Sequence, residues 1–282
     1  MATFTLMKQP EIYIHVGMGR VGSTFFQYQV FPKIRGLHYI QRTRFRQAKK
    51  IIGKGKSDKY LVSGELDNRY IEKYLKVFAD PYNFARPILI IRRHDEWIAS
   101  QYRRYLKNGN HWRFTDFFDL EDDKGYWKQE SLNYYPNILL LEKYFQHKPM
   151  VLLYDDLRKD SKAFIHQIVE YMDAEIQMDQ LNLSRRHASY NEMELRAVYR
   201  ASERINLRKK RPFNKKWKNV LLNLWTNLLR YAIIYGSHVL PGKFSTKEQI
   251  FPTEHQLGAI REHYNEDWEK CVAYGATSTT NR

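Results

Sequence analysis

The sequence predicts an α/β fold, with a central parallel sheet flanked by helices and a mainly helical C-terminal part. Apolar runs near residues 12 to 16, 60 to 63, 88 to 91 and 150 to 153 alternate with helical patterns. Runs of this kind are typical of parallel strands that are covered on both faces. From about Tyr190 onward, the pattern is essentially helical.

Length and composition favour one domain. A chain of 282 residues that is 43% hydrophobic can bury a substantial core. We expect a single domain over residues 1–282, with an α/β core over 1–189 and a helical extension over 190–282. No internal repeat interrupts this pattern.

The first element, residues 12–26, reads IYIHVGMGRVGSTFF and contains a glycine loop. An apolar run precedes Gly17, Gly19 and Gly22, and an apolar helix start follows at Ser23. Glycines allow backbone N–H groups to approach an anion closely, and a helix start adds a partial positive charge. The pattern therefore predicts a phosphate-binding turn between a strand and a helix.

The position of the basic residue distinguishes this loop from the loops of nucleoside-triphosphate enzymes. Those loops place Lys after the second glycine, where this sequence has Ser23, whereas here the positive charge is Arg20, inside the loop. The run Arg20-Val21-Gly22-Ser23-Thr24 resembles the 5′-phosphosulfate loop of sulfotransferases that use 3′-phosphoadenylyl sulfate (PAPS), which have a P-loop-like fold. The resemblance implies that residues 19–25 (Gly19, Arg20, Val21, Gly22, Ser23, Thr24 and Phe25) bind the donor, with Phe25 against the adenine.

Two later segments extend the resemblance. Arg92 follows the apolar run 88–91, and Ser100 lies eight positions further along a predicted helix. The same family holds the 3′-phosphate of its donor with an Arg and a Ser at this spacing. After the run 151–153, Tyr154 matches a Tyr that lies near the adenine in the family.

Glu65 is the candidate general base. It follows the short strand predicted over 59–63, and the carboxyl ends of parallel strands form the ligand-binding edge of such sheets. It resembles the Glu with which many carbohydrate and protein-tyrosine sulfotransferases take the proton of the acceptor hydroxyl. His38, His94 and His111 are alternative bases, because small-molecule members of the family use a His.

The resemblance implies in-line transfer of a sulfuryl group from PAPS to a hydroxyl-bearing acceptor, which leaves adenosine 3′,5′-bisphosphate (PAP). Arg20 would stabilise the leaving phosphate, and positioning and charge would supply most of the rate. The argument requires no metal ion, so we expect none. The Glu base and the closing helix near residues 254–274 favour a glycan or another glycoconjugate as acceptor.

Cysteine and charge suggest a compartment and a surface. Cys271 is the only cysteine, and the first strand starts by Ile12, so we expect a cytoplasmic, bacterial protein with no signal peptide. The net charge is +16, densest near residues 208–218, and an apolar helix with Trp follows. We expect this segment to pack on the core or on another subunit; contact of residues 208–240 with the inner membrane surface, which suits a glycolipid acceptor, is the alternative. The sequence does not predict the oligomeric state.

Two other functions share features with this sequence. A P-loop-type phosphotransferase, such as a small-molecule kinase, would share the sheet and the loop, with Asp155 or Asp156 as a metal-binding acid, but it would lack the loop Lys. A nucleic-acid-binding module would fit the pI of about 9.7, yet no readout motif is present, so we expect no nucleic-acid partner.

Overall fold

The computed structural model describes residues 9–65, 71–183, 190–209, 212–239 and 248–280. The chain clusters into two compact units. The first, the sheet unit, comprises residues 1–94, 131–184 and 263–282, and the second, the helical unit, comprises residues 95–130 and 185–262.

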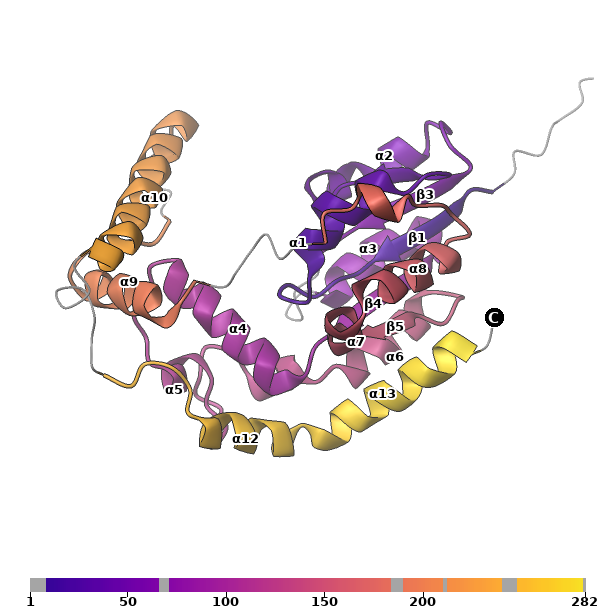
Figure 1. Cartoon of the computed structure of the whole chain (residues 1–282). Helices are drawn as coiled ribbons and strands as arrows, with labels where there is room; N and C mark the ends of the chain where they lie inside the picture. Colours follow the sequence, from indigo (N-terminus) through magenta and orange to yellow (C-terminus); the bar gives the residue numbers. More distant parts are fainter. Residues whose placement is uncertain (1–8, 66–70, 184–189, 210–211, 240–247, 281–282) are drawn as a thin grey trace, which may run out of the picture. The chain divides into compact units, whose positions relative to one another are not determined.

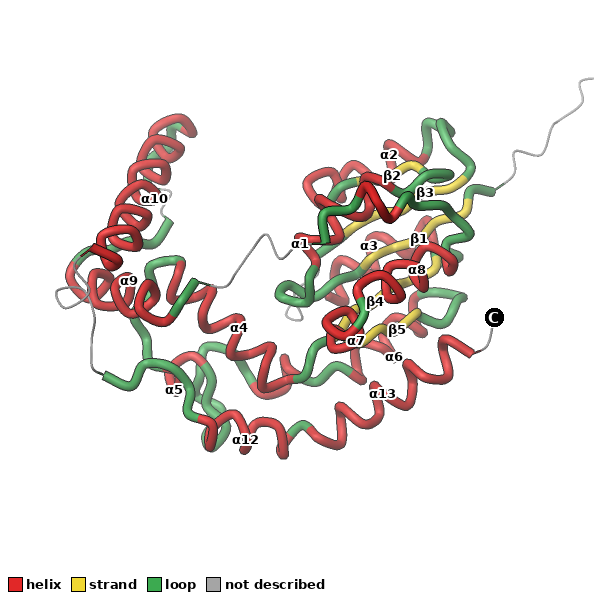
Figure 2. Tube along the Cα trace, in the orientation of Figure 1, coloured by secondary structure: helices red, strands yellow, loops and turns green. Residues whose placement is uncertain are grey.

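The sheet unit is built on a five-stranded sheet with the order β2-β3-β1-β4-β5, in which every pairing is parallel (Figures 1 and 2). The strands are β1 (Glu11–His15), β2 (His38–Ile40), β3 (Lys59–Ser63), β4 (Arg86–Ile91) and β5 (Met150–Leu153). This confirms the predicted α/β fold with a central parallel sheet. The short strand β2 was not predicted.

The strands explain why the sequence pattern was readable. In β4, residues 88–91 are all at most 1% exposed, so both faces of the strand are covered. A strand buried on both faces needs apolar residues at successive positions instead of alternating ones. This requirement produces the continuous apolar runs of the sequence.

Helices and single turns surround the sheet. In the sheet unit they are α1 (Ser23–Phe25), η1 (Phe26–Val30), η2 (Phe31–Lys33), η3 (Arg42–Gln47), α2 (Ala48–Ile52), α3 (Ile71–Tyr82), the second half of η4 (Gln129–Leu132), α6 (Tyr135–Tyr144), α7 (Tyr154–Lys159), α8 (Ser161–Tyr171), η5 (Met178–Gln180) and α13 (Asn265–Thr280). Helix α13 packs along β5, where a β-carbon at Gly275 would lie 3.1 Å from the carbonyl oxygen of Val151. The C-terminal helix thus belongs to the sheet unit.

The helical unit contains most of α4 (His94–Lys107) and of α12 (Glu254–His263), together with α5 (Phe114–Phe117), α9 (Glu192–Arg204) and α10 (Lys216–Val239). Helix α9 begins with a capping box: the Asn191 side chain accepts from the N–H of Glu194 at 2.8 Å, and the Glu194 carboxylate accepts from the N–H of Asn191 at 2.7 Å. The helical C-terminal part is therefore as predicted.

The two units do not coincide with the predicted boundary at residue 189. Residues 95–130 cluster with the later helices, and α13 returns to the sheet. Among the described residues, no helix combines the length and the hydropathy needed to cross a bilayer.

Candidate functional site

The glycine loop lies where the strand order of the sheet reverses. β1 pairs with β3 on one side and with β4 on the other, and the chain completes β2 and β3 before it crosses to β4 and β5. Open parallel sheets bind ligands outside the carboxyl ends of their strands at such a reversal. The loop over 16–22 leaves the carboxyl end of β1 and therefore occupies the position expected for a ligand site.

Left-handed backbone conformations shape this loop. Gly17, Arg20 and Gly22 have φ angles of 50°, 71° and 82°. This region is unfavourable for residues with a side chain, so Arg20 adopts it at some cost in free energy. The buried Ser23 hydroxyl donates to the carbonyl oxygen of Met18 at 2.6 Å and closes the loop from within.

The helix that leaves the loop begins with the predicted donor-binding residues. α1 starts at Ser23, directly after Gly22, and the helical turns continue through η1 and η2 to Lys33. Thr24 is exposed in the first turn, and the partly exposed Phe25 ring lies 5.4 Å from that of Phe26. Gly19 and Val21 are buried within the loop. The first N–H groups of a helix carry partial positive charge, which suits this end of the loop to an anion.

Two predicted site residues from distant parts of the chain, Arg92 and Tyr154, meet the loop in one cluster. Nη1 of Arg92, at the end of β4, donates to the carbonyl oxygen of Arg20 at 3.4 Å. The guanidinium carbon of Arg92 lies 4.8 Å from the centre of the Tyr154 ring, which follows β5. A β-carbon at Gly22 would lie 3.5 Å from Cε2 of Tyr154. We call Arg20, Gly22, Arg92 and Tyr154 the loop cluster.

Ser100 lies in the helical unit, on α4, and is 9% exposed. Its predicted partner Arg92 belongs to the sheet unit. The pairing of Arg92 with Ser100 at the 3′-phosphate therefore stays a prediction.

Glu65 lies two residues after the end of β3, the strand beside β1, and so at the same edge of the sheet as the loop. Its side chain is 16% exposed and forms an ion pair with Arg42. The neighbouring Gly64 contacts the loop, since a β-carbon at Gly17 would lie 3.2 Å from its carbonyl oxygen. The Arg42 guanidinium thus holds the Glu65 carboxylate in one position at this edge of the sheet.

The three histidines considered as alternative bases lie in different surroundings. His94 is 1% exposed, with its ring stacked between Tyr134 at 4.1 Å and Tyr264 at 4.7 Å. A ring enclosed in this way cannot reach an acceptor hydroxyl. His38 is partly exposed on β2, and the partly exposed His111 lies in the helical unit.

Asp267 on α13 is a partly buried polar residue that the sequence did not reveal. Its carboxylate accepts from Nε2 of His94 at 3.0 Å and from the backbone N–H groups of Tyr134 and Tyr135 at 2.8 and 3.0 Å. Burial raises the pKa of Asp267, but the hydrogen bonds outweigh burial and the net shift is downward. Because His94 lies two residues after Arg92, this carboxylate fixes the chain that carries Arg92.

His15 is a second missed residue and lies beneath the loop. It is fully buried at the end of β1, with Nδ1 3.1 Å from the Ser63 hydroxyl, which also accepts from Gln27 at 3.2 Å. A β-carbon at Gly17 would lie 2.7 Å from Cε1 of His15. The available signal was a single polar residue within the apolar run before the loop. Burial lowers the pKa of His15 from 6.5 to about 4.

His15 should therefore make the free energy of unfolding depend on pH. Between pH 6.5 and about 4, the unfolded chain binds a proton at this residue and the folded chain does not. Stability is thus complete above pH 6.5 and should fall by about 3 kcal/mol as the pH drops through this window. The free energy of unfolding can be measured with urea at several pH values. Its slope against pH should be shallower for His15→Gln than for the wild type.

The exposed His255 provides the control, because His255→Gln should leave the slope unchanged. Equal slopes for His15→Gln and the wild type would contradict the assignment of a neutral, buried His15.

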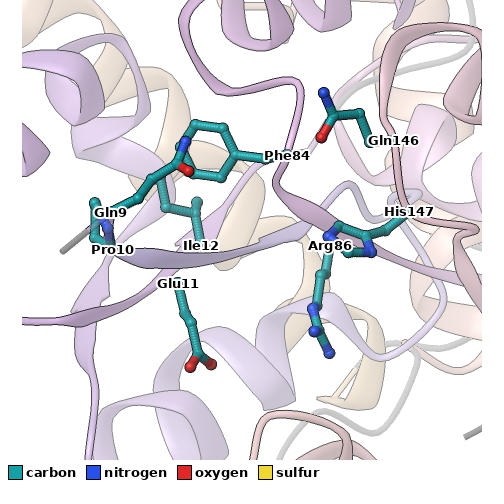
Figure 3. A pocket seen from close by; sticks show the side chains of 8 residues that line it. All are labelled: Gln9, Pro10, Glu11, Ile12, Phe84, Arg86, Gln146 and His147. Carbon is teal, nitrogen blue, oxygen red and sulfur yellow. The ribbon is translucent and has the colours of Figure 1, made fainter.

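One pocket opens at the opposite edge of the sheet (Figure 3). It has a volume of 290 Å³ and lies at the amino ends of β1 and β4, lined by Gln9, Pro10, Glu11, Ile12, Phe84, Arg86, Gln146 and His147. Ligands of open parallel sheets bind at the carboxyl ends instead. We therefore place the candidate site at the loop cluster and not at this pocket.

Comparisons with known proteins add a likeness of structure. No protein-family model matches the chain, and no curated protein matches it. Among solved structures, it is similar to a sulfotransferase from Alicyclobacillus acidocaldarius, with 12% sequence identity and a TM-score of 0.49, over 68% of this chain and 92% of that chain.

Proposed function

We propose that this protein transfers a sulfuryl group from PAPS to the hydroxyl group of an acceptor. The observation that best supports the proposal is the loop cluster, in which Arg92 contacts both the glycine loop and the ring of Tyr154. Loop N–H groups and a guanidinium bind phosphates, and an aromatic face can pack on a purine. A nucleotide with phosphates on two ribose carbons would place one phosphate on the loop N–H groups and the other on the Arg92 guanidinium.

Each residue has a part in this proposal. The N–H groups from Gly19 to Thr24 bind the 5′-phosphate, and Arg92 binds the 3′-phosphate. Tyr154 and Phe25 lie against the adenine. Arg20 and Glu65 act on the reacting groups.

In the proposed reaction, one bond to sulfur forms, one breaks, and one proton moves to Glu65. The acceptor oxygen bonds to sulfur while the bond from sulfur to the bridging oxygen of the 5′-phosphate breaks. Glu65 takes the hydroxyl proton, and Arg20 stabilises the charge that builds up on the bridging oxygen, so that PAP leaves. We propose a carbohydrate or another glycoconjugate as the acceptor.

Nucleotide binding tests the proposal. Isothermal titration should show that PAP binds more tightly than ATP with Mg²⁺. Arg92→Ala should weaken PAP binding by about 10- to 100-fold, because a charge-assisted hydrogen bond to the 3′-phosphate is lost. The same variant should bind adenosine 5′-phosphate, which has no 3′-phosphate, nearly as well as the wild type does.

Arg86, at the amino end of the same strand, provides the matched control, and Arg86→Ala should leave PAP binding unchanged. A preference for ATP with Mg²⁺ would assign the loop to a phosphotransferase. Equal losses of PAP and adenosine 5′-phosphate in Arg92→Ala would refute the 3′-phosphate site.

A further inference from the structure

Helix α10 exposes its apolar side. Eight large apolar residues recur along it at helical spacing, each between 45% and 69% exposed: Trp217, Val220, Leu221, Leu224, Trp225, Leu228, Tyr231 and Tyr235. Their spacing of three or four residues places them on neighbouring turns of one side. Soluble helices turn such a stripe toward the core. A contiguous apolar surface of this kind marks a contact with something outside the chain.

The other side of α10 carries polar groups into the protein. Thr226 and Arg230 are both 7% exposed, and Ser237 is fully buried. Nη1 of Arg230 donates to the carbonyl oxygen of Lys107 at 3.3 Å, and its Nη2 donates to Asn227. The hydroxyls of Thr226 and Ser237 donate to carbonyl oxygens of their own helix at 2.8 and 2.6 Å. The usual arrangement of a surface helix is therefore reversed.

The reversed helix remains anchored by a small apolar cluster. Ile233 and Ile234 pack against Ala197, Val198 and Leu207 in the helical unit. Because these two residues and the polar groups already hold α10 in place, its exposed apolar side is not needed to fix the helix on this unit.

Charge identifies the kind of surface that fits. No Asp or Glu occurs between Glu203 and Glu248, and the only charged residue from 219 to 237 is the buried Arg230. The exposed residues Lys215, Lys216 and Lys218 lie at the start of the helix. An apolar side with a purely basic end matches a lipid bilayer with anionic headgroups.

A second copy of the chain fits less well. A symmetric dimer would bring the same patch of each subunit together. The patch contains no acidic residue to pair with its lysines, and each chain carries a net charge of +16. Like charges would therefore oppose this contact, whereas they favour an anionic surface.

We propose that α10 lies in the plane of an anionic membrane surface. The exposed side from Val220 to Tyr235 enters the boundary between headgroups and acyl chains, and the lysines at the start of α10 contact the headgroups. This exposed side includes Trp225, Tyr231 and Tyr235, and Trp and Tyr side chains favour this boundary. The inference does not depend on the proposed function.

Vesicle sedimentation tests this inference. The full chain should bind vesicles of phosphatidylcholine with 30% phosphatidylglycerol, as about one anionic lipid in three gives a strong surface potential, and should bind pure phosphatidylcholine much more weakly. The triple variant Leu221→Ser, Trp225→Ser, Leu228→Ser should lower the partition coefficient by about tenfold or more, because three apolar contacts are lost. The triple variant Lys215→Glu, Lys216→Glu, Lys218→Glu should also lower the partition coefficient at low salt. Added salt should reduce its difference from the wild type, because salt screens the charges.

A matched control removes three exposed apolar residues elsewhere. Val77, Leu139 and Ile205 are 72%, 45% and 48% exposed, and their replacement by Ser should leave vesicle binding unchanged. Hydrogen exchange of the wild-type chain provides a readout that needs no variant, since anionic vesicles should protect the amides of α10.

Three outcomes would overturn the inference. The wild type could fail to bind anionic vesicles, or the serine variant of α10 could bind as well as the control variant. A lipid-free dimer that the serine variant of α10 abolishes would instead assign the surface to a second copy. Each variant should also be titrated with PAP. PAP binding should be retained in all of them, so that a failure of the membrane inference can be told apart from a failure of the proposed function.

Discussion

Replacement of Arg20 by alanine should lower the turnover number for sulfuryl transfer by about 10²- to 10³-fold, the usual loss when one group that stabilises transition-state charge is removed. The binding of PAP should change little, because Arg20 acts mainly on the charge that develops as the donor breaks. The backbone at residue 20 has a φ angle of 71°, which costs alanine about as much as arginine, so the fold should persist.

The measurement needs an acceptor, which a screen of sugars and glycolipids with radiolabelled PAPS would supply. Arg20→Lys keeps the charge with the same backbone cost and should retain much more activity than Arg20→Ala. Lys143 is 64% exposed on α6, and Lys143→Ala controls for the loss of a positive charge elsewhere, with turnover expected to be unchanged. Unchanged turnover in Arg20→Ala would remove Arg20 from the mechanism.

Replacement of Glu65 by glutamine should lower turnover by about 10²- to 10⁴-fold, the range that general base catalysis contributes. Glutamine has nearly the same shape but cannot take the acceptor proton. Nucleotide binding should be retained, since Glu65 acts on the acceptor. Activity assays and titration with PAP on the same preparation would separate the two effects.

The ion pair of Glu65 with Arg42 provides a sharper control. Arg42→Ala removes the partner that holds the Glu65 carboxylate in place, so turnover should fall by less than in Glu65→Gln, and the double variant should lose little more than Glu65→Gln alone. Fully additive losses in the double variant would show that the two residues do not act as a pair. Near-normal turnover in Glu65→Gln would transfer the base role to another residue, with His38 as the next candidate.

The sheet and the loop cluster were readable because their signals are local. The apolar runs predicted four strands, and the glycine spacing predicted the loop after the first of them. Arg92 and Tyr154 each follow such a run, and the carboxyl ends of parallel strands share one edge, so their meeting with the loop could be expected.

The residues beneath and beside the loop could not be found in this way. His15 bonds to Ser63 because β1 and β3 pair in register, with these two residues side by side. Asp267 reaches His94 across 173 positions of sequence. One sequence contains no signal for pairings of this length, since they depend on how the helices pack.

Helix α10 separates the two kinds of information most clearly. Its sequence predicted an apolar helix with Trp, but a helical pattern is the same whichever side faces the protein. Only the tertiary structure, with Arg230 buried and Trp225 67% exposed, showed that polar groups face inward and apolar groups outward. The sequence by itself determined the strands, the loop and the helices, because these follow from backbone preferences and local periodicity. Tertiary structure decided which groups meet and which side of a helix meets solvent, because those depend on contacts between distant segments.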